Sequence, residues 1–343
     1  MISKIKLKGF RLFLDKSLDT NNSLVILSGD NATGKTSILE AIYLCSTSKS
    51  HRTTIAESMI LDGEPFSRVD TINDGRDYRV VVSKKGKSYF IDDKEIKKAG
   101  EFIGSLSVIM SSPLDIYLIN GSKGERRRFL DLEISLFDKH YLNSLSKYKK
   151  LLNERNNLLK TNGIDNILLD VLTDELIIEL KKIYDTRIKF ISDLNAYLEL
   201  IARDLDIESI KIKYQKTYDE DIKKSFMAKL ELDKLTKVTN IGSHRDDFKI
   251  YINDRDASLY ASEGQMRIIC IAIKLALMQY KTNTLKIEPI LLLDDVFAAL
   301  DSNRIRSVVK YVKRAKQAFI TTTSLGEIPK ELIEGSLVLK IER

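Results

Sequence analysis

The sequence predicts an α/β fold in which two strand-and-helix segments flank a helical insertion. Apolar runs typical of buried strands occur at residues 24–27, 289–293 and 318–322, near the two ends of the chain. Between residues 124 and 237 there is no proline, and the only glycine after the first position is Gly163. A chain of 343 residues is also long for one hydrophobic core, so more than one lobe is expected.

Strands are expected mainly in the two flanking segments. Residues 2–7 begin a strand pattern, and residues 78–82 and 88–91 alternate in polarity on either side of a turn at 84–87. That arrangement predicts a β-hairpin. From Asn240 onward the sequence again alternates between strand-like and helix-like stretches.

The insertion has helical periodicity. Apolar residues recur at steps of three and four over residues 141–152 and again over 177–201, with a break at 161–163. This pattern predicts an antiparallel helical arm, and a plain helix bundle fits the short repeat equally well. The predicted domains are an N-terminal head part at 1–122, a helical lobe at 123–238 and a C-terminal head part at 239–343.

Composition narrows the class of protein. The net charge of +7 suits a polyanionic partner such as DNA, although a lysine-rich solvated surface would explain it as well. The two cysteines, Cys45 and Cys270, lie in apolar helical stretches, which predicts packing residues rather than a disulfide or a zinc site. Because no apolar run is long enough to cross a bilayer and the start has no signal-peptide pattern, we expect a cytoplasmic protein without membrane contact.

A phosphate-binding loop follows the first buried strand. Residues 29–36 match G-x-x-x-x-G-K-[ST], and a helix-forming stretch comes next. Glycines let the backbone surround phosphate oxygens, and the helix start adds amide donors. Lys35 is expected on the outer phosphates of ATP, and Thr36 on Mg²⁺. The predicted nucleotide-binding residues of this loop are Gly29, Asp30, Asn31, Ala32, Thr33, Gly34, Lys35, Thr36 and Ser37.

The apolar strand at 289–293 ends in two carboxylates, Asp294 and Asp295. An acidic strand end beside a phosphate loop is the expected position for a metal-holding acid. Asp294 is therefore predicted to hold Mg²⁺, and Asp295 to orient or deprotonate the attacking water. With Lys35, these two form the predicted catalytic set.

A third motif opens a helical stretch at residues 262–267. Ser262, Gly264 and Gln265 place a hydroxyl, a glycine and an amide at a helix start. In ABC-type ATPases such an element completes the γ-phosphate site of a facing protomer, so the motif predicts a homodimer formed on ATP binding. An ordinary serine N-cap is the alternative. Residues 299–301 match the D-loop of the same class.

Three further strings make the chain resemble the RecF family of SMC-like proteins. They are residues 41–53 after the phosphate loop, residues 121–131, and the string GSHRDD at 242–247, in which Ser243 replaces a proline. The resemblance covers essentially the whole chain. It implies an ABC-type P-loop ATPase head with an inserted antiparallel, coiled-coil-like helical lobe. It also implies weak, DNA-stimulated ATP hydrolysis, binding to double-stranded DNA at gap junctions, and cooperation with RecR and RecO in loading a recombinase.

The sequence departs from that family pattern at two positions, and it differs from ABC transporters at a third. Ala299 stands where a glutamate is expected. Leu114 replaces an acidic residue, with Asp115 beside it as the alternative. After the late strand, Thr322 and Thr323 take the place of the switch histidine usual in ABC transporters.

Other candidates leave alternatives open. Arg11 is a predicted nucleotide contact or a surface arginine at a strand edge. The pairs at residues 51–52 and 244–245 are either site residues or structural polar groups. The basic clusters that could meet DNA phosphates are 126–128, 147–150 and 313–316. Competing functions are another SMC-like DNA-binding ATPase, a P-loop small-molecule kinase and a non-catalytic nucleotide-binding scaffold.

Overall fold

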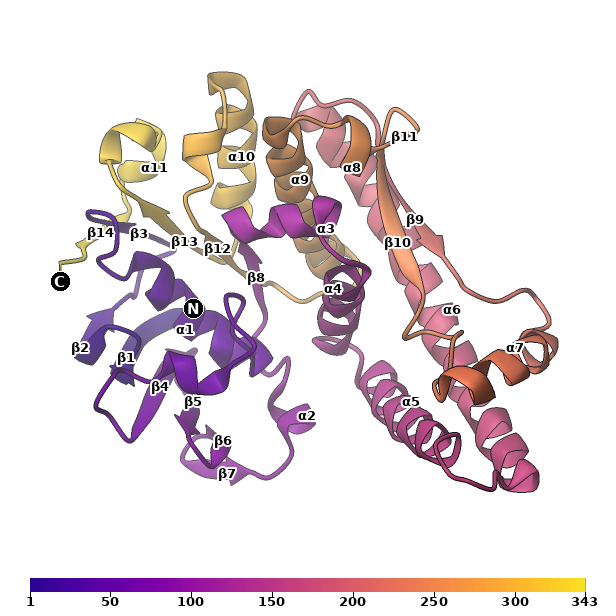
Figure 1. Ribbon diagram of the computed structural model, residues 1–343. Coiled ribbons are helices and arrows are strands. Elements are labelled where there is room, and N and C mark those ends of the chain that lie inside the picture. The colour runs from indigo at the N-terminus through magenta and orange to yellow at the C-terminus, as the bar shows by residue number, and fades with distance from the viewer. Residues whose placement is uncertain (343) are drawn as a thin grey trace. The chain divides into compact units, whose positions relative to one another are not determined.

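The structure is a computed structural model that describes residues 1–342, apart from the side chain of Ala299. Its chain divides into two units (Figure 1). Unit 1 comprises Met1–Ile116, Tyr197–Glu208 and the described chain from Ala261 onward. Unit 2 comprises Tyr117–Ala196 and Ser209–Tyr260.

These units differ from the predicted domain ranges in two segments. Residues 239–260 group with unit 2, because β10 (Asp247–Ile252) pairs along its whole length with β9 (Ile210–Gln215). Residues 197–208 group with unit 1, because the last turns of the long helix α6 (Asn166–Asp204) pack on unit 1 helices through Tyr197 and Asp204.

Unit 1 contains an antiparallel sheet of six strands in the order β2-β1-β4-β5-β6-β7. The predicted hairpin is confirmed, because β5 and β6 pair with Val82 opposite Lys87. Apolar residues alternate along β1 and β5, so one face of the sheet is buried. The strands are β1 (Ile2–Phe10), β2 (Phe13–Asp19), β4 (Phe66–Asn73), β5 (Arg76–Ser83), β6 (Gly86–Ile91) and β7 (Lys94–Ile96).

The second sheet of unit 1 is entirely parallel, in the order β14-β3-β13-β12-β8. Its three inner strands are rich in apolar residues and almost wholly buried, as expected for strands covered on both faces. The three buried strands predicted from the sequence are thereby confirmed. The strands are β3 (Leu24–Ser28), β8 (Val108–Ser111), β12 (Ile290–Leu293), β13 (Gln317–Thr322) and β14 (Leu337–Lys340).

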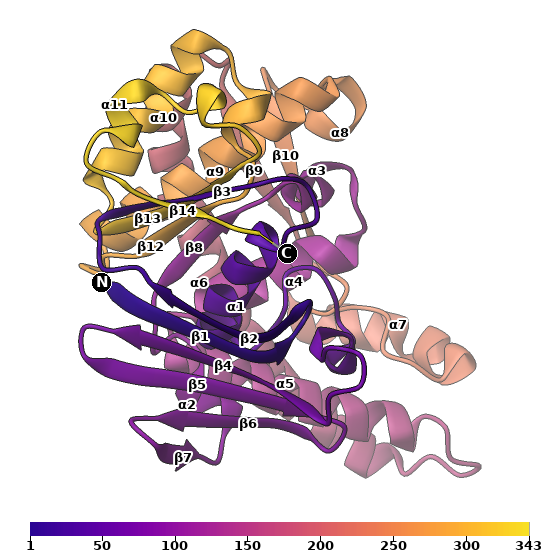
Figure 2. The same ribbon diagram turned by 90° about the vertical axis from the view of Figure 1, so that its left-hand side faces the viewer.

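Helix α1 (Lys35–Thr47) lies between the two sheets of unit 1 (Figure 2). It packs against β4 and β5 of the antiparallel sheet and against β8 and β13 of the parallel one. Both of its sides are therefore buried, which ties the helix after the phosphate loop to the main core. The other helices of unit 1 include α2 (Ala99–Phe102), α9 (Glu263–Asn283), α10 (Ser302–Arg314) and α11 (Lys330–Ile333).

Unit 2 contains the predicted pair of long helices, α5 (Lys139–Leu158) and α6, separated by the break at 161–163. Its other helices include α3 (Tyr117–Asn120), α4 (Lys123–Ser135), α7 (Ile222–Thr236) and α8 (Ala257–Tyr260). The expectation of a purely helical lobe needs correction, because β9 pairs with β10 and β11 (Arg255–Asp256) completes a three-stranded sheet. The strand arises from an alternation of two, Ile210-Lys-Ile-Lys-Tyr214, which the helical periodicity on either side concealed.

Both cysteines are buried and neither forms a disulfide, as predicted. Within residues 1–342, no helix combines the length and the apolar character that crossing a membrane requires.

Candidate nucleotide-binding site

The site lies at one edge of the parallel sheet, where the carboxyl ends of neighbouring strands meet. β3 ends in the phosphate loop, β12 ends in Asp294, and the register places Leu293 opposite Ile320 of β13 and opposite Ser111 of β8. Because parallel strands all point the same way, chain segments that are distant in sequence converge here. This edge is the usual ligand position in open α/β sheets.

The phosphate loop needs glycine at its last position before the helix. Gly34 has a φ of 101°, a left-handed conformation that side chains disfavour. A Cβ atom at this position would lie 2.5 Å from Cζ of Phe13. Gly34 is also the N-cap of α1 and offers no side chain to cap it, so the first amides of the helix are available to an anion.

Lys35 is held inside the loop. Its Nζ donates hydrogen bonds to the carbonyl oxygens of Gly29 at 2.6 Å and Asp30 at 2.7 Å. The side chain of Thr33 closes the loop further by donating to the carbonyl of Asp30 at 2.9 Å. The loop thus places a buried ammonium group at the start of α1, where positive charge and amide donors act together on an anion.

Asp294 joins the loop to the acidic strand. Its Oδ1 accepts hydrogen bonds from the hydroxyls of Thr36 at 2.9 Å and Thr321 at 2.8 Å, and its own amide donates to the carbonyl of Ser111. Burial raises the pKa of Asp294, and the hydrogen bonds from Thr321 and Thr36 oppose that rise. Sequence reasoning found Thr36 and Asp294 but missed Thr321.

Asp295 occupies a strained turn next to the buried carboxylate. Its φ of 50° is unusual for a residue with a side chain, and its amide donates to Oγ1 of Thr321 at 3.0 Å. Burial, followed by the negative charge of Asp294, raises the pKa of Asp295. A small pocket adjoins both carboxylates and is also lined by Ser111, Cys270 of α9 and other residues.

The oxygen atoms around Asp294 fit a magnesium ion. Mg²⁺ prefers hard oxygen ligands and is commonly held by one carboxylate together with a hydroxyl and substrate phosphates. The hydroxyl of Thr36 and the carboxylate of Asp294 lie together beside the phosphate loop. Among the described residues, no group of three or more acidic, histidine or cysteine side chains is arranged to hold a metal ion, so an all-protein metal cage is absent from that part of the chain.

The third sequence motif, residues 262–267, forms the start of α9. The hydrogen bonds of Ser262 and Gln265 are made within the motif and not to the residues around Asp294. Oγ of Ser262 accepts from the amide of Gln265, and Oε1 of Gln265 accepts from the amide of Ser262 at 2.9 Å. This reciprocal capping box matches the alternative reading of an N-cap. Ser262, Gly264 and Gln265 are all exposed, and a side chain on Gly264 would meet open space.

Arg11 lies against a buried carboxylate of α1. Its guanidinium donates two hydrogen bonds to Glu40, at 2.5 and 2.9 Å, and a third to the carbonyl of Ser58. Burial would raise the pKa of Glu40, but the hydrogen bonds from Arg11 and Ser50 outweigh it and the pKa is lowered. Arg11 therefore has a structural partner, and its backbone is also in the left-handed region, with a φ of 55°.

Arg52 is more loosely held than Arg11. Its side chain is 41% exposed and lies 3.5 Å from the Glu40 carboxylate, while its charge lowers the pKa of Asp294. The neighbouring His51 has both ring nitrogens buried without a partner, and burial lowers its pKa to about 4. Of the two, Arg52 is the one whose charge acts on the cluster around Asp294.

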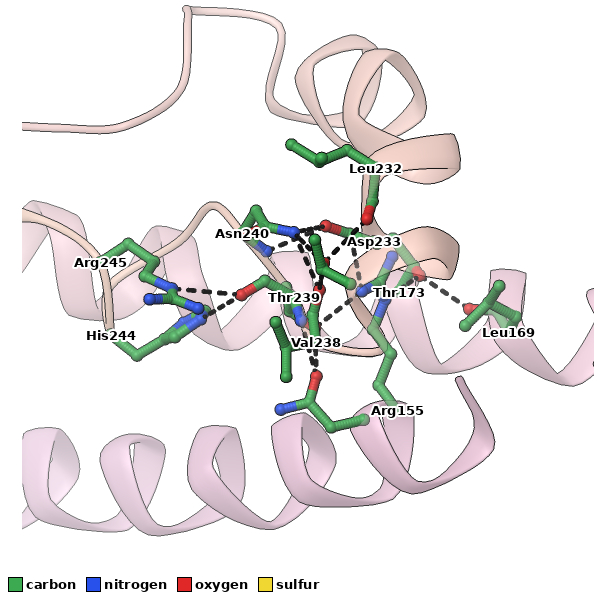
Figure 3. A network of polar contacts seen from close by, with 12 residues as sticks. Arg155, Leu169, Thr173, Leu232, Asp233, Val238, Thr239, Asn240, His244 and Arg245 are labelled. Atoms are coloured by element: carbon green, nitrogen blue, oxygen red, sulfur yellow. Dashed lines mark hydrogen bonds and ion pairs between the residues drawn. The ribbon is translucent and has the colours of Figure 1, made fainter. Parts of the chain in front are cut away.

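The string at 242–247 is a polar turn within unit 2. His244 bonds Tyr148. It also bonds the carbonyl of Thr239, which Arg245 reaches at 3.3 Å (Figure 3). Asp247 at the end of the string accepts two hydrogen bonds from Arg126. These contacts support the structural reading of the turn.

The structure also shows the surroundings of the positions at which the sequence differs from the family pattern or from ABC transporters. Leu114 is exposed, and its neighbour Asp115 forms an ion pair with Lys274 of α9 at 3.0 Å. Thr322 bonds Ser324 and Glu327, so its hydroxyl is directed away from the acidic pair. The expected glutamate position, Ala299, has a side chain that lies outside the described part of the chain.

Known proteins resemble the chain over nearly its whole length. The RecF/RecN/SMC N terminal domain family matches residues 1–331. The chain is 38% identical to the DNA replication and repair protein RecF of Acholeplasma laidlawii (strain PG-8A) over 325 residues, which cover 94% of this chain and 93% of that one. It is 36% identical over 353 residues to the protein of the same name from Clostridium perfringens (strain 13 / Type A), with 99% and 98% covered.

Solved structures give the same result. The recombination mediator protein RecF-ATP in the RecFOR pathway has a TM-score of 0.88 and 28% identity, covering 96% of this chain and 93% of that one. An SMC head bound to the C-winged helix domain of ScpA has a TM-score of 0.54 at 14% identity, which is a likeness of fold alone. From the family match, the identities and the ABC-type head, we conclude that the chain belongs to the RecF family of SMC-like ABC ATPases.

Proposed function

We propose that this protein is an ATP-dependent DNA-binding ATPase of recombinational gap repair. It would dimerise on binding ATP, bind duplex DNA near single-strand gaps and help load a recombinase. The observation that carries the proposal is the hydrogen bond between Thr36 and Asp294, because it joins the phosphate loop to the acidic strand at one sheet edge. Relatives named DNA replication and repair protein RecF, and RecF structures with ATP, support the same reading.

ATP capture would rest on the loop and the first turn of α1. The phosphate oxygens would accept hydrogen bonds from the backbone amides of the loop and from the ammonium group of Lys35. In the structure, that ammonium group donates to two loop carbonyls. Thr36 and Asp294 would hold Mg²⁺, which supplies charge neutralisation for the phosphate oxygens. The Thr36 hydroxyl donates its hydrogen bond to Asp294. The lone pairs of that hydroxyl oxygen therefore stay available to a cation.

Hydrolysis would depend on Asp295 as the group that orients or deprotonates water. Its raised pKa makes it a better proton acceptor than an ordinary exposed aspartate. The small pocket beside Asp294 and Asp295 gives space for that water, and Ser111 and Ser112 are among the residues that line it.

Dimerisation would bring the start of α9 from one protomer to the nucleotide of the other. Ser262, Gly264 and Gln265 are exposed, so they are accessible to a partner. A helix N-terminus with an exposed hydroxyl and an unobstructed glycine suits a terminal phosphate. In that complex the capping hydrogen bond of Ser262, which is long at 3.3 Å, would be exchanged for one to the nucleotide.

DNA contact is best supported on α5 of unit 2. In the predicted cluster 126–128, Arg126 is bound by Asp247 and Arg127 donates to the carbonyl of Asp246, so both have structural roles. Lys149 and Lys150 are 63% and 78% exposed, their nearest carboxylates are 3.8 and 3.7 Å away, and both line a shallow polar hollow. Such loosely paired cations are free to contact phosphates.

A charge-matched comparison tests this placement. The double change Lys149→Gln/Lys150→Gln should weaken binding to gapped duplex DNA and lower the slope of log K against log salt by about 2. The control is Lys313→Gln/Lys316→Gln, because those lysines already pair with Glu331 at 2.8 Å and Asp74 at 3.0 Å. An unchanged slope in the α5 variant, or an equal loss in the control, would remove α5 from the DNA interface.

The partners RecR and RecO and a cytoplasmic location rest on family membership and on the RecFOR pathway named for the solved relative. The activity itself is tested by phosphate release from ATP with and without gapped duplex DNA, comparing the native chain with Lys35→Met. We expect slow, DNA-stimulated release that Lys35→Met abolishes. Equal release by both proteins would refute the proposed ATPase site.

A further inference from the structure

One hydroxyl connects the two acidic residues of the site. Thr321, on β13, donates to Oδ1 of Asp294 at 2.8 Å and accepts from the amide of Asp295 at 3.0 Å. The residue is 2% exposed, so water does not compete strongly for either bond. Both of its hydrogen bonds therefore go to the acidic pair.

The direction of these bonds is fixed by chemistry. A hydroxyl has one proton to donate in a hydrogen bond, and an ionised carboxylate can only accept. Thr321 is therefore the donor in its hydrogen bond with Asp294. The backbone amide of Asp295 can only donate, so it uses a lone pair of the same oxygen. Oδ1 of Asp294 accepts a second hydrogen bond, from the hydroxyl of Thr36. Oδ2 is therefore the oxygen of this carboxylate with fewer hydrogen bonds.

The backbone at Asp295 needs such support. A φ of 50° costs free energy in a residue that is not glycine, and a strained position persists only where its surroundings hold it. The hydrogen bond from its amide to Thr321 is one such restraint. The next residue on the strand, Thr322, faces the other way and bonds Ser324 and Glu327, so it cannot take over this role.

We propose that Thr321 is a positioning residue for ATP hydrolysis, orienting the Asp294 carboxylate toward the magnesium site and fixing the turn that presents Asp295 to water. This inference rests on the proposed ATPase function. Thr321 touches neither nucleotide nor metal in this scheme and acts through the two aspartates. Groups that orient a metal ligand by hydrogen bonding contribute substantially to metal affinity and activity. Removing such a group therefore lowers both.

The decisive comparison is between Thr321→Val and Thr321→Ser in the full chain. Valine keeps the shape and loses the hydroxyl, whereas serine keeps the hydroxyl and loses the methyl group. We expect Thr321→Val to lower the apparent Mg²⁺ affinity, measured through Mg²⁺-dependent binding of a fluorescent ATP analogue, and kcat by roughly 10- to 100-fold. Thr321→Ser should stay within about threefold of the native protein in both measurements.

Matched controls separate this role from packing and from the proposed function. Thr71→Val makes the same change at a buried strand position of β4, and should leave both measurements unchanged. Native values in Thr321→Val, or an equal loss in Thr321→Ser, would overturn the positioning role. Should Thr321→Val lack the native thermal unfolding transition, Thr321→Ala replaces it in the comparison with serine under the same criteria. Lys35→Met is measured in parallel, because hydrolysis by that variant would refute the ATPase site itself, whichever way the Thr321 comparison falls.

Discussion

Replacing Arg155 by methionine should destabilise unit 2 by about 3–5 kcal/mol, because it breaks a buried ion pair from one side. Arg155 is fully buried and donates to Asp233 at 2.9 Å, to Thr239 at 2.7 Å and to Thr173 at 2.9 Å (Figure 3). These bonds link α5 to α6, to α7 and to the loop before the polar turn.

The size of the effect follows from what Asp233 loses. Its carboxylate is 0% exposed, and without Arg155 it would keep only neutral donors, the amide and the side chain of Asn240, both at 2.9 Å. A buried charge without its counter-ion is far more costly than a neutral group. The double variant Arg155→Met/Asp233→Asn removes that charge while keeping an oxygen for Asn240, and should recover more than about 2 kcal/mol relative to the single variant.

Urea unfolding of the full chain, followed by circular dichroism and by proteolysis within unit 2, measures this difference. Because the free energy of unfolding falls by about 1–3 kcal/mol for each molar of urea, a loss of 3 kcal/mol corresponds to a urea midpoint about 1–3 M lower. A change below about 1 kcal/mol in Arg155→Met, or a double variant no more stable than the single one, would refute the reasoning.

Three other variants test separate parts of the structure. Gly34→Ala should abolish binding of a fluorescent ATP analogue without unfolding the chain, because its methyl group would collide with Phe13; retained binding would contradict the assigned loop geometry. Glu40→Gln should lower the free energy of unfolding by about 2–4 kcal/mol, since Arg11 would lose its charged partner, and a neutral result in urea would refute that pairing. His244→Gln should flatten the pH dependence of stability. Burial lowers the pKa of His244 to about 4, so the unfolded chain takes up the proton first and stability falls as pH drops from 6.5 to 4; an unaltered pH profile would exclude this histidine as the cause.

Features encoded in short stretches of chain were predictable. The loop around Lys35 and the acidic end of β12 each follow from a local pattern, because a phosphate loop requires a strand, a glycine-containing turn and a helix in direct succession. The hairpin of β5 and β6 is local in the same sense. Whether these residues carry the proposed chemical roles stays a prediction.

Features that depend on distant pairing could not be predicted. Thr321 is an ordinary strand residue in the sequence, and only the register of β12 with β13 places it beside Asp294. Once the strand order is known, Thr321 can be recognised as a candidate, because its hydroxyl lies near the carboxyl end of the strand next to β12. Arg126 likewise belongs to a basic cluster in the sequence, and Asp247, more than a hundred residues away, turns it into a structural group.

The secondary structure of the insertion was predicted only in part for a related reason. Its helices have strong periodicity, but β9 is a single short strand whose partner, β10, lies beyond α7. An isolated strand has no stability without a partner, so its sequence signal is weak where helices surround it. That pairing also moved residues 239–260 from the predicted head part into unit 2.

The most direct test of an ATP-bridged dimer is the mass of the protein in solution with a non-hydrolysable ATP analogue and Mg²⁺, measured by light scattering after size exclusion. The native chain should change from 39.2 kDa to twice that mass, while Ser262→Arg should bind the analogue and stay at 39.2 kDa. A native protein that remains at the single-chain mass with bound nucleotide, or a Ser262→Arg variant that doubles in mass as readily, would contradict the account.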